Sequence, residues 1–289
     1  LKSPTYDEQF YLVRGAAFVK RGELHMLIGE PVLLNALNAL PLLLLPDLRL
    51  PTELPSWSET SFHASSEAFL WRVNPNAEQI IFLARLPTMA LALLLAAFVY
   101  RWSQALFGPW GALLSLLLVA FDPNLIAHGR LANTDLGATA LILISAYWAW
   151  RLLRRPNWAH LAAAGITLGL AQASRFTALM LGPSLLVLFA VRLFERQPFV
   201  PRPLGARAAE WTLKNRWRRL PALLLIGLLV IVIAYLTVWA VHGFQFGPVQ
   251  GQTAFPVPAP AYWEQLFYIL QRVEREGQAF LLGELYTGG

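Results

Sequence analysis

Two adjacent carboxylates, Asp7 and Glu8, are the first side chains of the sequence that could perform chemistry. Neighbouring residues of a helix point about 100° apart, so we expect one to work and the other to support it, without chelating one metal ion. Glu8 has a simpler explanation as the capping-box partner of Thr5, and Asp7 could merely complement the helix dipole. Beside a membrane-embedded cavity, Asp7 could equally act as a general base, because partial desolvation raises its basicity.

A second group of polar side chains lies between residues 121 and 135. Asp122 and Asn124 are typical of a turn around a proline, and Thr134 or Asp135 could cap the helix that follows. The remaining charged and imidazole groups place positive and negative side chains in one short connection next to the lipid. We interpret them as candidates for the functional site or for binding the acceptor substrate: His128, Arg130 and Asp135.

Two arginines next to apolar stretches form the third group. Arg85 lies within about two helical turns of an expected span end, and Arg175 lies between two apolar spans. Arginine in such places can simply reach the lipid headgroups. A guanidinium is also suited to bidentate contact with phosphate, so Arg85, Arg175 and Arg130 are candidates to bind the phosphate of a lipid-linked substrate. His63 is a supporting candidate on the same face.

Several kinds of chemistry are poorly supported. The chain has no cysteine, which removes thiolate nucleophiles and cysteine metal sites. It has no glycine-rich phosphate loop and no zinc-type histidine spacing. We therefore expect no cofactor, although a divalent metal is not excluded. The net charge is +6 and the pI is near 9.9, but the basic residues form no long face with interleaved aromatics, which argues against nucleic acid as a partner.

The elements that carry these residues are apolar helices. Hydrophobic residues make up 56% of the chain and charged residues 14%, with a mean hydropathy of +0.48, whereas a soluble domain carries about 25% charged residues. A membrane-spanning helix needs roughly 20 apolar residues. The pattern predicts an all-α, polytopic transmembrane helical bundle of about six membrane helices, at 80–100, 110–127, 133–150, 158–173, 176–194 and 220–242.

The arginine-rich connections predict the orientation, because cytoplasmic loops retain Lys and Arg. One connection follows the third expected span and the other follows the fifth, and their basic residues are Arg151, Arg154, Arg155, Arg192, Arg196, Arg202, Arg207, Lys214, Arg216, Arg218 and Arg219. Passing back and forth through the spans then puts every candidate residue at or near the opposite, outer surface. Tryptophan and tyrosine at span ends, such as Trp102 and Trp150, indicate an interfacial belt.

The outer segments are expected to contain helices of their own. A helix should run from Thr5 to about Arg21 and end at Gly22, and the apolar stretch 32–45, interrupted by Pro41, should lie in the membrane interface. An amphipathic helix is expected at 263–271. We divide the chain into an extracytoplasmic segment with the acidic motif at 1–78, a membrane bundle at 79–242 and a second extracytoplasmic segment at 243–289, which we expect to be truncated before further membrane helices.

With these residues in view, the chain resembles the membrane glycosyltransferases of the dolichyl-phosphate-mannose protein mannosyltransferase type, a C-type superfamily with bacterial relatives. The order, spacing and shared outer face of several short motifs carry the resemblance: Tyr6-Asp7-Glu8, Gly29-Glu30-Pro31, Ala84-Arg85-Leu86-Pro87, Asp122 to Arg130, Asn133-Thr134-Asp135, Ser174-Arg175-Phe176-Thr177 and Phe280 to Glu284. The sequence departs from the family by lacking a membrane helix before Asp7 and by stopping shortly after Glu284.

The resemblance implies a function. It implies transfer of a sugar from a polyprenyl-phosphate donor to an acceptor hydroxyl on protein, lipid or polysaccharide, on the extracytoplasmic side and with inversion. It also implies that Asp7 is the catalytic base, with Glu8 beside it. We expect an integral protein of a bacterial inner membrane. The alternative is a transporter or lipid-handling protein, but transporters commonly show paired repeats and polar groups at the midplane, which the sequence does not.

Overall fold

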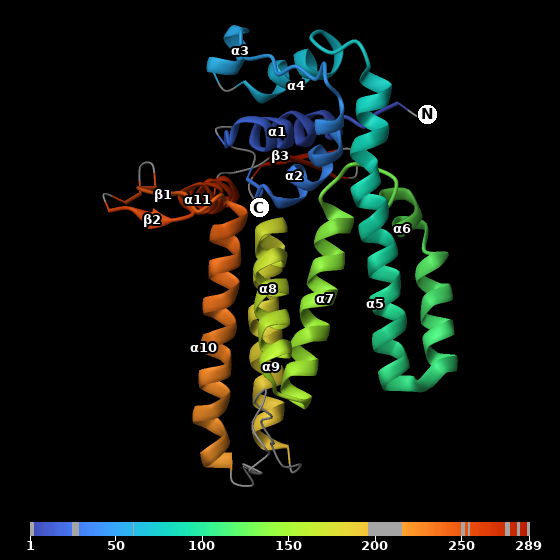
Figure 1. Ribbon diagram of the computed structural model, residues 1–289, viewed down its shortest axis with the longest axis vertical. Coiled ribbons are helices and arrows are strands. Elements are labelled where there is room, and N and C mark those ends of the chain that lie inside the picture. The colour runs from blue at the N-terminus through green and yellow to red at the C-terminus, as the bar shows by residue number, and fades with distance from the viewer. Residues whose placement is uncertain are drawn as a thin grey trace.

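The computed structural model describes residues 3–24, 29–59, 61–195, 216–249, 252–253, 255–274, 278–281 and 284–287. Long helices run side by side, and shorter helices lie across one end of them (Figure 1). We call the end that carries the short N-terminal helices the upper end, as drawn in Figure 1, and the opposite one the lower end. The fold is an all-α helical bundle of the membrane type.

The long helices are α5 (Ala77–Ala120), α7 (Asp135–Arg154), α8 (Trp158–Ser174), α9 (Leu181–Phe194) and α10 (Arg216–Val241), with the 3₁₀ helix η2 (Phe176–Met180) leading into α9. Within the described part of the chain, four helices are long and apolar enough to cross a membrane: Ala77–Ala120, Asp135–Arg154, Phe176–Phe194 and Arg219–Val241. The expected number of six is therefore not confirmed.

The difference arises in α5 and α8. The expected spans 80–100 and 110–127 belong to α5, whose 44 residues turn back at Gly108 (φ 75°, ψ −174°) into two legs (Figure 1). The second leg ends at Ala120, because Pro123 opens a separate short helix, α6 (Pro123–His128), capped by the Asp122 side chain. The fourth expected span is α8, which has only 17 residues.

Close approach of α8 to α10 holds the bundle together. Gly165 and Gly169 lie one turn apart on α8, and an added Cβ at Gly169 would lie 2.5 Å from both the Ala234 carbonyl oxygen and the Thr237 Cβ. Small residues at this spacing let two membrane helices come within backbone contact. Packing of α7 on the other side of α8 extends the same core.

The upper end is built from α1 (Glu8–Arg21), α2 (Leu33–Ala39), the 3₁₀ helix η1 (Leu40–Leu44), α3 (Pro55–Ser58) and α4 (Phe62–Trp71). The expected first helix is present but begins at Glu8, three residues after Thr5, and its stop is confirmed, because Gly22 ends α1 with φ 70°. The apolar stretch 32–45 forms two short helices, α2 and η1, with Leu44 exposed at its end. Leu12, Val13 and Leu70 are buried in the core between these helices and the first leg of α5.

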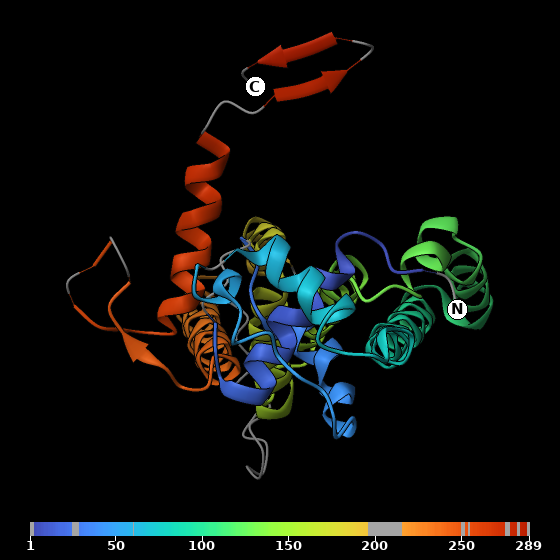
Figure 2. The ribbon, with the colours of Figure 1, turned by 90° about the horizontal axis from the view of Figure 1, so that it is seen from above.

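The C-terminal part adds α11 (Pro260–Glu274) and two short antiparallel hairpins: β1 (Phe246–Gly247) with β2 (Val257–Pro258), and β3 (Gln278–Leu281) with β4 (Glu284–Thr287). The expected helix at 263–271 lies inside α11. The sequence did not predict the strands. Figure 2 shows α11 extending away from the bundle, with β3 and β4 beyond its end.

The helix ends agree with the expected alternation of the chain. The helices α5, α7 and η2 begin at the upper end, and α8 and α10 end there (Figure 1). The expected arginine-rich connection after α7 lies at the lower end. Most of the second one, including Arg196, Arg202, Arg207 and Lys214, lies outside the described residues.

Candidate functional site

Glu8 is completely buried and its carboxylate accepts five hydrogen bonds. Arg85 on α5 donates from Nε and Nη2, each at 2.8 Å, in a bidentate ion pair. The backbone amides of Ala132 and Thr5 also donate at 2.8 Å, and the Thr5 hydroxyl at 3.2 Å. Burial alone would raise the pKa of Glu8, but the hydrogen bonds and the charge of Arg85 outweigh it and hold this pKa below 4.5.

Asp7 has a different environment although it is the next residue. Its side chain is exposed, and within the described part of the chain its carboxylate has no hydrogen bond or ion pair. Only its carbonyl oxygen is engaged, by the amides of Phe10 and Tyr11 in the first turn of α1. The Glu8 carboxylate is therefore buried and fully hydrogen-bonded, whereas the Asp7 carboxylate is accessible.

His63 on α4 contacts two aromatic residues close to Asp7 in the sequence, Tyr6 and Phe10. Its Nδ1 lies 3.1 Å from the Tyr6 hydroxyl, and its ring meets the edge of Phe10 with centroids 5.0 Å apart. His63 is exposed. The structure therefore brings this predicted residue to the segment that carries Asp7.

Arg175 lies at the centre of a second polar cluster at the upper end, between α8 and η2. Its guanidinium forms an ion pair with Asp135 at the start of α7, donates to the Thr134 hydroxyl at 3.3 Å and lies 3.6 Å from Glu30. The Thr134 hydroxyl donates to Glu30 at 3.1 Å. Arg175 is 31% exposed, so one side of this cation remains accessible.

Tyr11 connects the two groups. Burial raises the pKa of Tyr11 above 10, and the negative charges of Glu30 and Asp7 add to this, while Thr134 and Arg175 oppose it. Tyr11 is therefore close to Asp7 on one side and to the Arg175 cluster on the other. A phenol with a raised pKa stays protonated at neutral pH and can donate a hydrogen bond.

Arg14, one turn further along α1, interacts with Glu30 through their opposite charges. It is buried and donates to the Pro31 carbonyl oxygen at 3.3 Å. Burial lowers the pKa of Arg14 to about 10, against the charge of Glu30, which raises it. The group stays cationic at neutral pH and helps to fix the Gly29-Glu30-Pro31 segment, which α11 also holds through a hydrogen bond from the Gly29 amide to Gln265 at 2.8 Å.

The connection between α5 and α7 supplies the remaining predicted residues. Asp122 accepts from the Leu125 amide at 2.9 Å, as expected for a turn residue. The exposed His128 ring lies 2.9 Å from the Asn133 side-chain nitrogen. Arg130 is exposed and has no hydrogen bond or ion pair within the described residues. Its guanidinium is therefore available at the surface of this connection.

Sequence reasoning placed the main groups but missed three. Glu30 was quoted only as part of a Gly-Glu-Pro motif, and neither Tyr11 nor Arg14 was singled out. The available signal was the period of α1: residues 7, 11 and 14 follow the spacing of one helix face. Arg85, expected to bind phosphate, instead contacts Glu8 and is only about 7% exposed.

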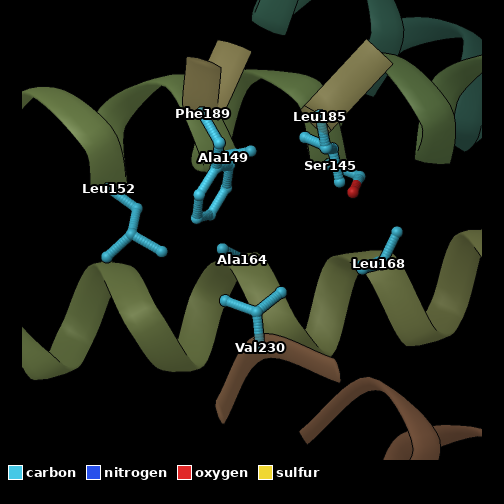
Figure 3. Close-up of a pocket in the computed structure, with 8 residues that line it drawn as sticks. All are labelled: Ser145, Ala149, Leu152, Ala164, Leu168, Leu185, Phe189 and Val230. Atoms are coloured by element: carbon cyan, nitrogen blue, oxygen red, sulfur yellow. The ribbon is translucent and has the colours of Figure 1, made fainter. Parts of the chain in front are cut away.

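The structure does not provide a metal site among the residues it describes, since they contain no group of three or more His, Asp and Glu side chains that could hold an ion. A separate pocket between α7, α8, α9 and α10 is lined mainly by apolar side chains, including Ala149, Leu168 and Val230 (Figure 3). Its cavity volume of about 10 Å³ holds at most one water molecule, so it is not a sugar site.

Comparison with known proteins found a family match to part of the chain. Residues 77–201 match the model of the dolichyl-phosphate-mannose-protein mannosyltransferases. No curated protein and no solved structure matched the chain. The matched residues include Arg85, His128, Arg130, Asp135 and Arg175, whereas Asp7, Glu8 and His63 precede them. The resemblance is thus confirmed over α5 to α9, and the match indicates an integral membrane glycosyltransferase of the mannosyltransferase kind.

Proposed function

Taking this family match as the premise, we propose that the chain transfers a sugar from a polyprenyl-phosphate donor to an acceptor hydroxyl at the upper end of the bundle. The observation that supports this proposal most directly is the difference in exposure and hydrogen bonding between the adjacent carboxylates of Asp7 and Glu8. Glu8 is saturated by five hydrogen bonds, so it has no free lone pair for a substrate. Asp7 is exposed and lies near the cluster around Arg175, where a phosphate could bind.

In the proposed reaction, Asp7 is the general base. It accepts the proton of the acceptor hydroxyl while that oxygen attacks the anomeric carbon of the donor. The bond from this carbon to the phosphate oxygen breaks, and the polyprenyl phosphate leaves with the electron pair. A single displacement of this kind inverts the anomeric centre.

The cations divide into two roles in this proposal. Arg175, partly exposed, exchanges some of its contact with Asp135 for the donor phosphate, and the free guanidinium of Arg130 approaches from the neighbouring connection. Guanidinium groups are suited to this because they donate two parallel hydrogen bonds. Arg85 is a positioning residue, since its guanidinium is occupied by Glu8. His63 and His128 border the acceptor.

We further propose that the upper end is extracytoplasmic in a bacterial inner membrane. The lower end carries Arg151 and Arg154 in the last turn of α7 and Arg155 directly after it, and arginine-rich ends of this kind remain in the cytoplasm. The polyprenyl tail would then lie among the long helices, whose outward faces expose large apolar side chains such as Leu93 and Leu186.

The experiment is donor consumption by the protein in liposomes, with a panel of polyprenyl-phosphate sugars and release of polyprenyl phosphate as the readout. Asp7→Asn should reduce turnover by roughly 10²- to 10⁴-fold, the usual contribution of a general base, with an unchanged melting temperature because the side chain makes no hydrogen bond to any residue that the structure describes. Asp47→Asn, at another exposed carboxylate of the upper end, is the matched control and should keep full activity.

Full transfer by Asp7→Asn would remove Asp7 as the base. Consumption of no donor by folded wild-type protein would contradict the transferase itself.

A further inference from the structure

An aromatic and cationic cluster lies at the lower end of the bundle, far from the proposed catalytic residues. Two of its residues belong to the first leg of α5 and four to the last two turns of α7. We call them the lower cluster: Arg101, Trp102, Tyr147, Trp150, Arg151 and Arg154. Neither the family match nor the proposed transfer reaction assigns a role to this end of the molecule.

A buried tyrosine organises the cluster. Tyr147 is 1% exposed, and its hydroxyl accepts a hydrogen bond from Arg101 Nε at 2.9 Å. The guanidinium carbon of Arg151 lies 6.0 Å from the centre of the same ring. Two cations from two helices are thus held against one rigid side chain. Arg154 adds a third, 5.0 Å from the Trp150 ring centre.

The cluster contains hydrogen-bond donors that have no acceptor. The indole Nε1 of Trp102 and the Nε of Arg151 are both buried and have no hydrogen-bond partner among the residues that the structure describes. Leaving a buried donor without an acceptor costs about 1–3 kcal/mol. The Trp102 ring lies 6.0 Å from both the Tyr147 and the Trp150 rings, so its donor belongs to the same group.

The described segments that carry these cations have no carboxylate close to them in the sequence. The chain has no Asp or Glu between residues 79 and 121 or between 136 and 194. The next acid, Glu195, is paired with Arg192 at 2.6 Å. Three guanidinium groups, two of them placed against aromatic rings and one bonded to Tyr147, lie beside the unpaired donors of Trp102 and Arg151, and the described residues offer them no close acid. Together they form a site for an anion with several oxygen acceptors.

We propose that the lower cluster binds the phosphate of an anionic glycerophospholipid in the lower leaflet. A lipid is favoured over a soluble anion because the site lies on the membrane-facing surface of the bundle. Large apolar side chains are exposed beside it, at the turn of α5, where they can contact the acyl chains: Leu106, Phe107 and Trp110. Tyrosine and tryptophan are also the side chains that prefer the depth of lipid headgroups.

The test is lipid binding by the whole chain in a neutral detergent, where no anionic surface contributes a general attraction. The protein is titrated with phosphatidylglycerol or phosphatidylcholine, and bound lipid is counted by native mass spectrometry. Wild type should retain one phosphatidylglycerol in preference to phosphatidylcholine. Arg101→Gln and Arg151→Gln should each weaken this binding roughly tenfold, as expected for loss of a charge-assisted hydrogen bond.

Two further variants separate a defined site from general electrostatics. Arg155→Gln removes the same charge from an exposed position at the same end of α7, without an aromatic contact, and should bind as wild type does. Tyr147→Phe keeps every charge but removes the hydroxyl that holds Arg101, and should weaken binding to a smaller extent. Its melting temperature shows that the bundle remains folded.

Three results would overturn the proposal. One is equal loss of lipid in Arg101→Gln, Arg151→Gln and Arg155→Gln, which would mean general attraction. Another is no preference of wild type for phosphatidylglycerol. The third is full displacement of the lipid by millimolar inorganic phosphate, which would identify a soluble anion as the ligand.

Discussion

At the scale of single residues, the main result is that Asp7 and Glu8 differ so strongly. The sequence correctly predicted a link between Thr5 and Glu8, because a capping box is a local pattern. It could not predict that Arg85, 77 positions away, would reach the same carboxylate, since that contact depends on how α1 packs on α5. The consequence is that Arg85, a candidate to bind phosphate by its position alone, is occupied by a protein partner.

The Glu8 pair leads to a prediction about pH. The pKa of Glu8 is lower in the folded protein than its ordinary value of 4.5. A group with a depressed folded pKa contributes stability that is fully present above its unfolded pKa and is lost as the pH falls through the folded value. We therefore expect the stability that Glu8 contributes to be constant above about pH 5 and to be lost as the pH falls below about pH 4.5.

Glu8→Gln provides the comparison. It removes the carboxylate charge that pairs with the buried Arg85, and breaking a buried pair costs about 3–5 kcal/mol, so its melting temperature at neutral pH should be clearly lower. Its decline between pH 4.5 and pH 3 should be shallower, since one titrating carboxylate is gone. Thermal unfolding in detergent across this range measures both. Parallel curves for the two proteins would show that Glu8 does not carry the acid sensitivity.

At the scale of elements, hydropathy and breakers predicted most helices but not how they are joined. The expected spans 80–100 and 110–127 are the two helical legs of α5, which meet at Gly108. This residue takes a positive φ that few other residues adopt, with Pro109 directly after it. The expected end at residue 127 was wrong because Asp122 and Pro123 start a new helix. The crossing of α1 over α2, which fixes Glu30 relative to Asp7, left no pattern in the sequence.

Gly15 makes that crossing possible and can be tested. A Cβ at this position would lie 2.0 Å from the Asn35 carbonyl oxygen, a backbone atom that cannot rotate away. Gly15→Ala should therefore push α2 away from α1, at a cost of about 1–3 kcal/mol. Because the Glu30 segment leads directly into α2, donor consumption should fall together with the melting temperature.

Gly182→Ala is the matched control for Gly15→Ala. A Cβ at Gly182 meets nothing within 4 Å, and alanine is favoured in helices over glycine. This variant should keep activity and melt at the same or a slightly higher temperature. If Gly15→Ala behaved like Gly182→Ala, the close approach of the two helices would not matter for the site.

At the scale of the whole molecule, the arrangement separates two chemistries at opposite ends of one bundle. The upper end gathers carboxylates, histidines and arginines from α1, α4, α5, α7, the connection between α5 and α7, and the junction of α8 with η2, whereas the described part of the lower end carries arginines and aromatic rings. Counting arginines in the loops predicted this polarity from the sequence, because each pass through the bundle reverses the side on which the next loop lies. Which groups touch within each end depended on packing and was not predictable in this way.

The orientation of this bundle can be measured by labelling introduced cysteines, because the chain contains no cysteine of its own. Ala64 on α4 and Ala159 on α8 are both exposed, and they lie at the upper and lower ends. We expect a membrane-impermeant maleimide to label Ala64→Cys in intact cells or right-side-out vesicles, and to label Ala159→Cys only after permeabilisation, because arginine-rich connections stay in the cytoplasm. The cysteine-free wild type gives the background. Labelling of both variants from one side would contradict the fold itself, whereas reversed labelling would keep the fold and move the proposed catalytic end to the cytoplasm.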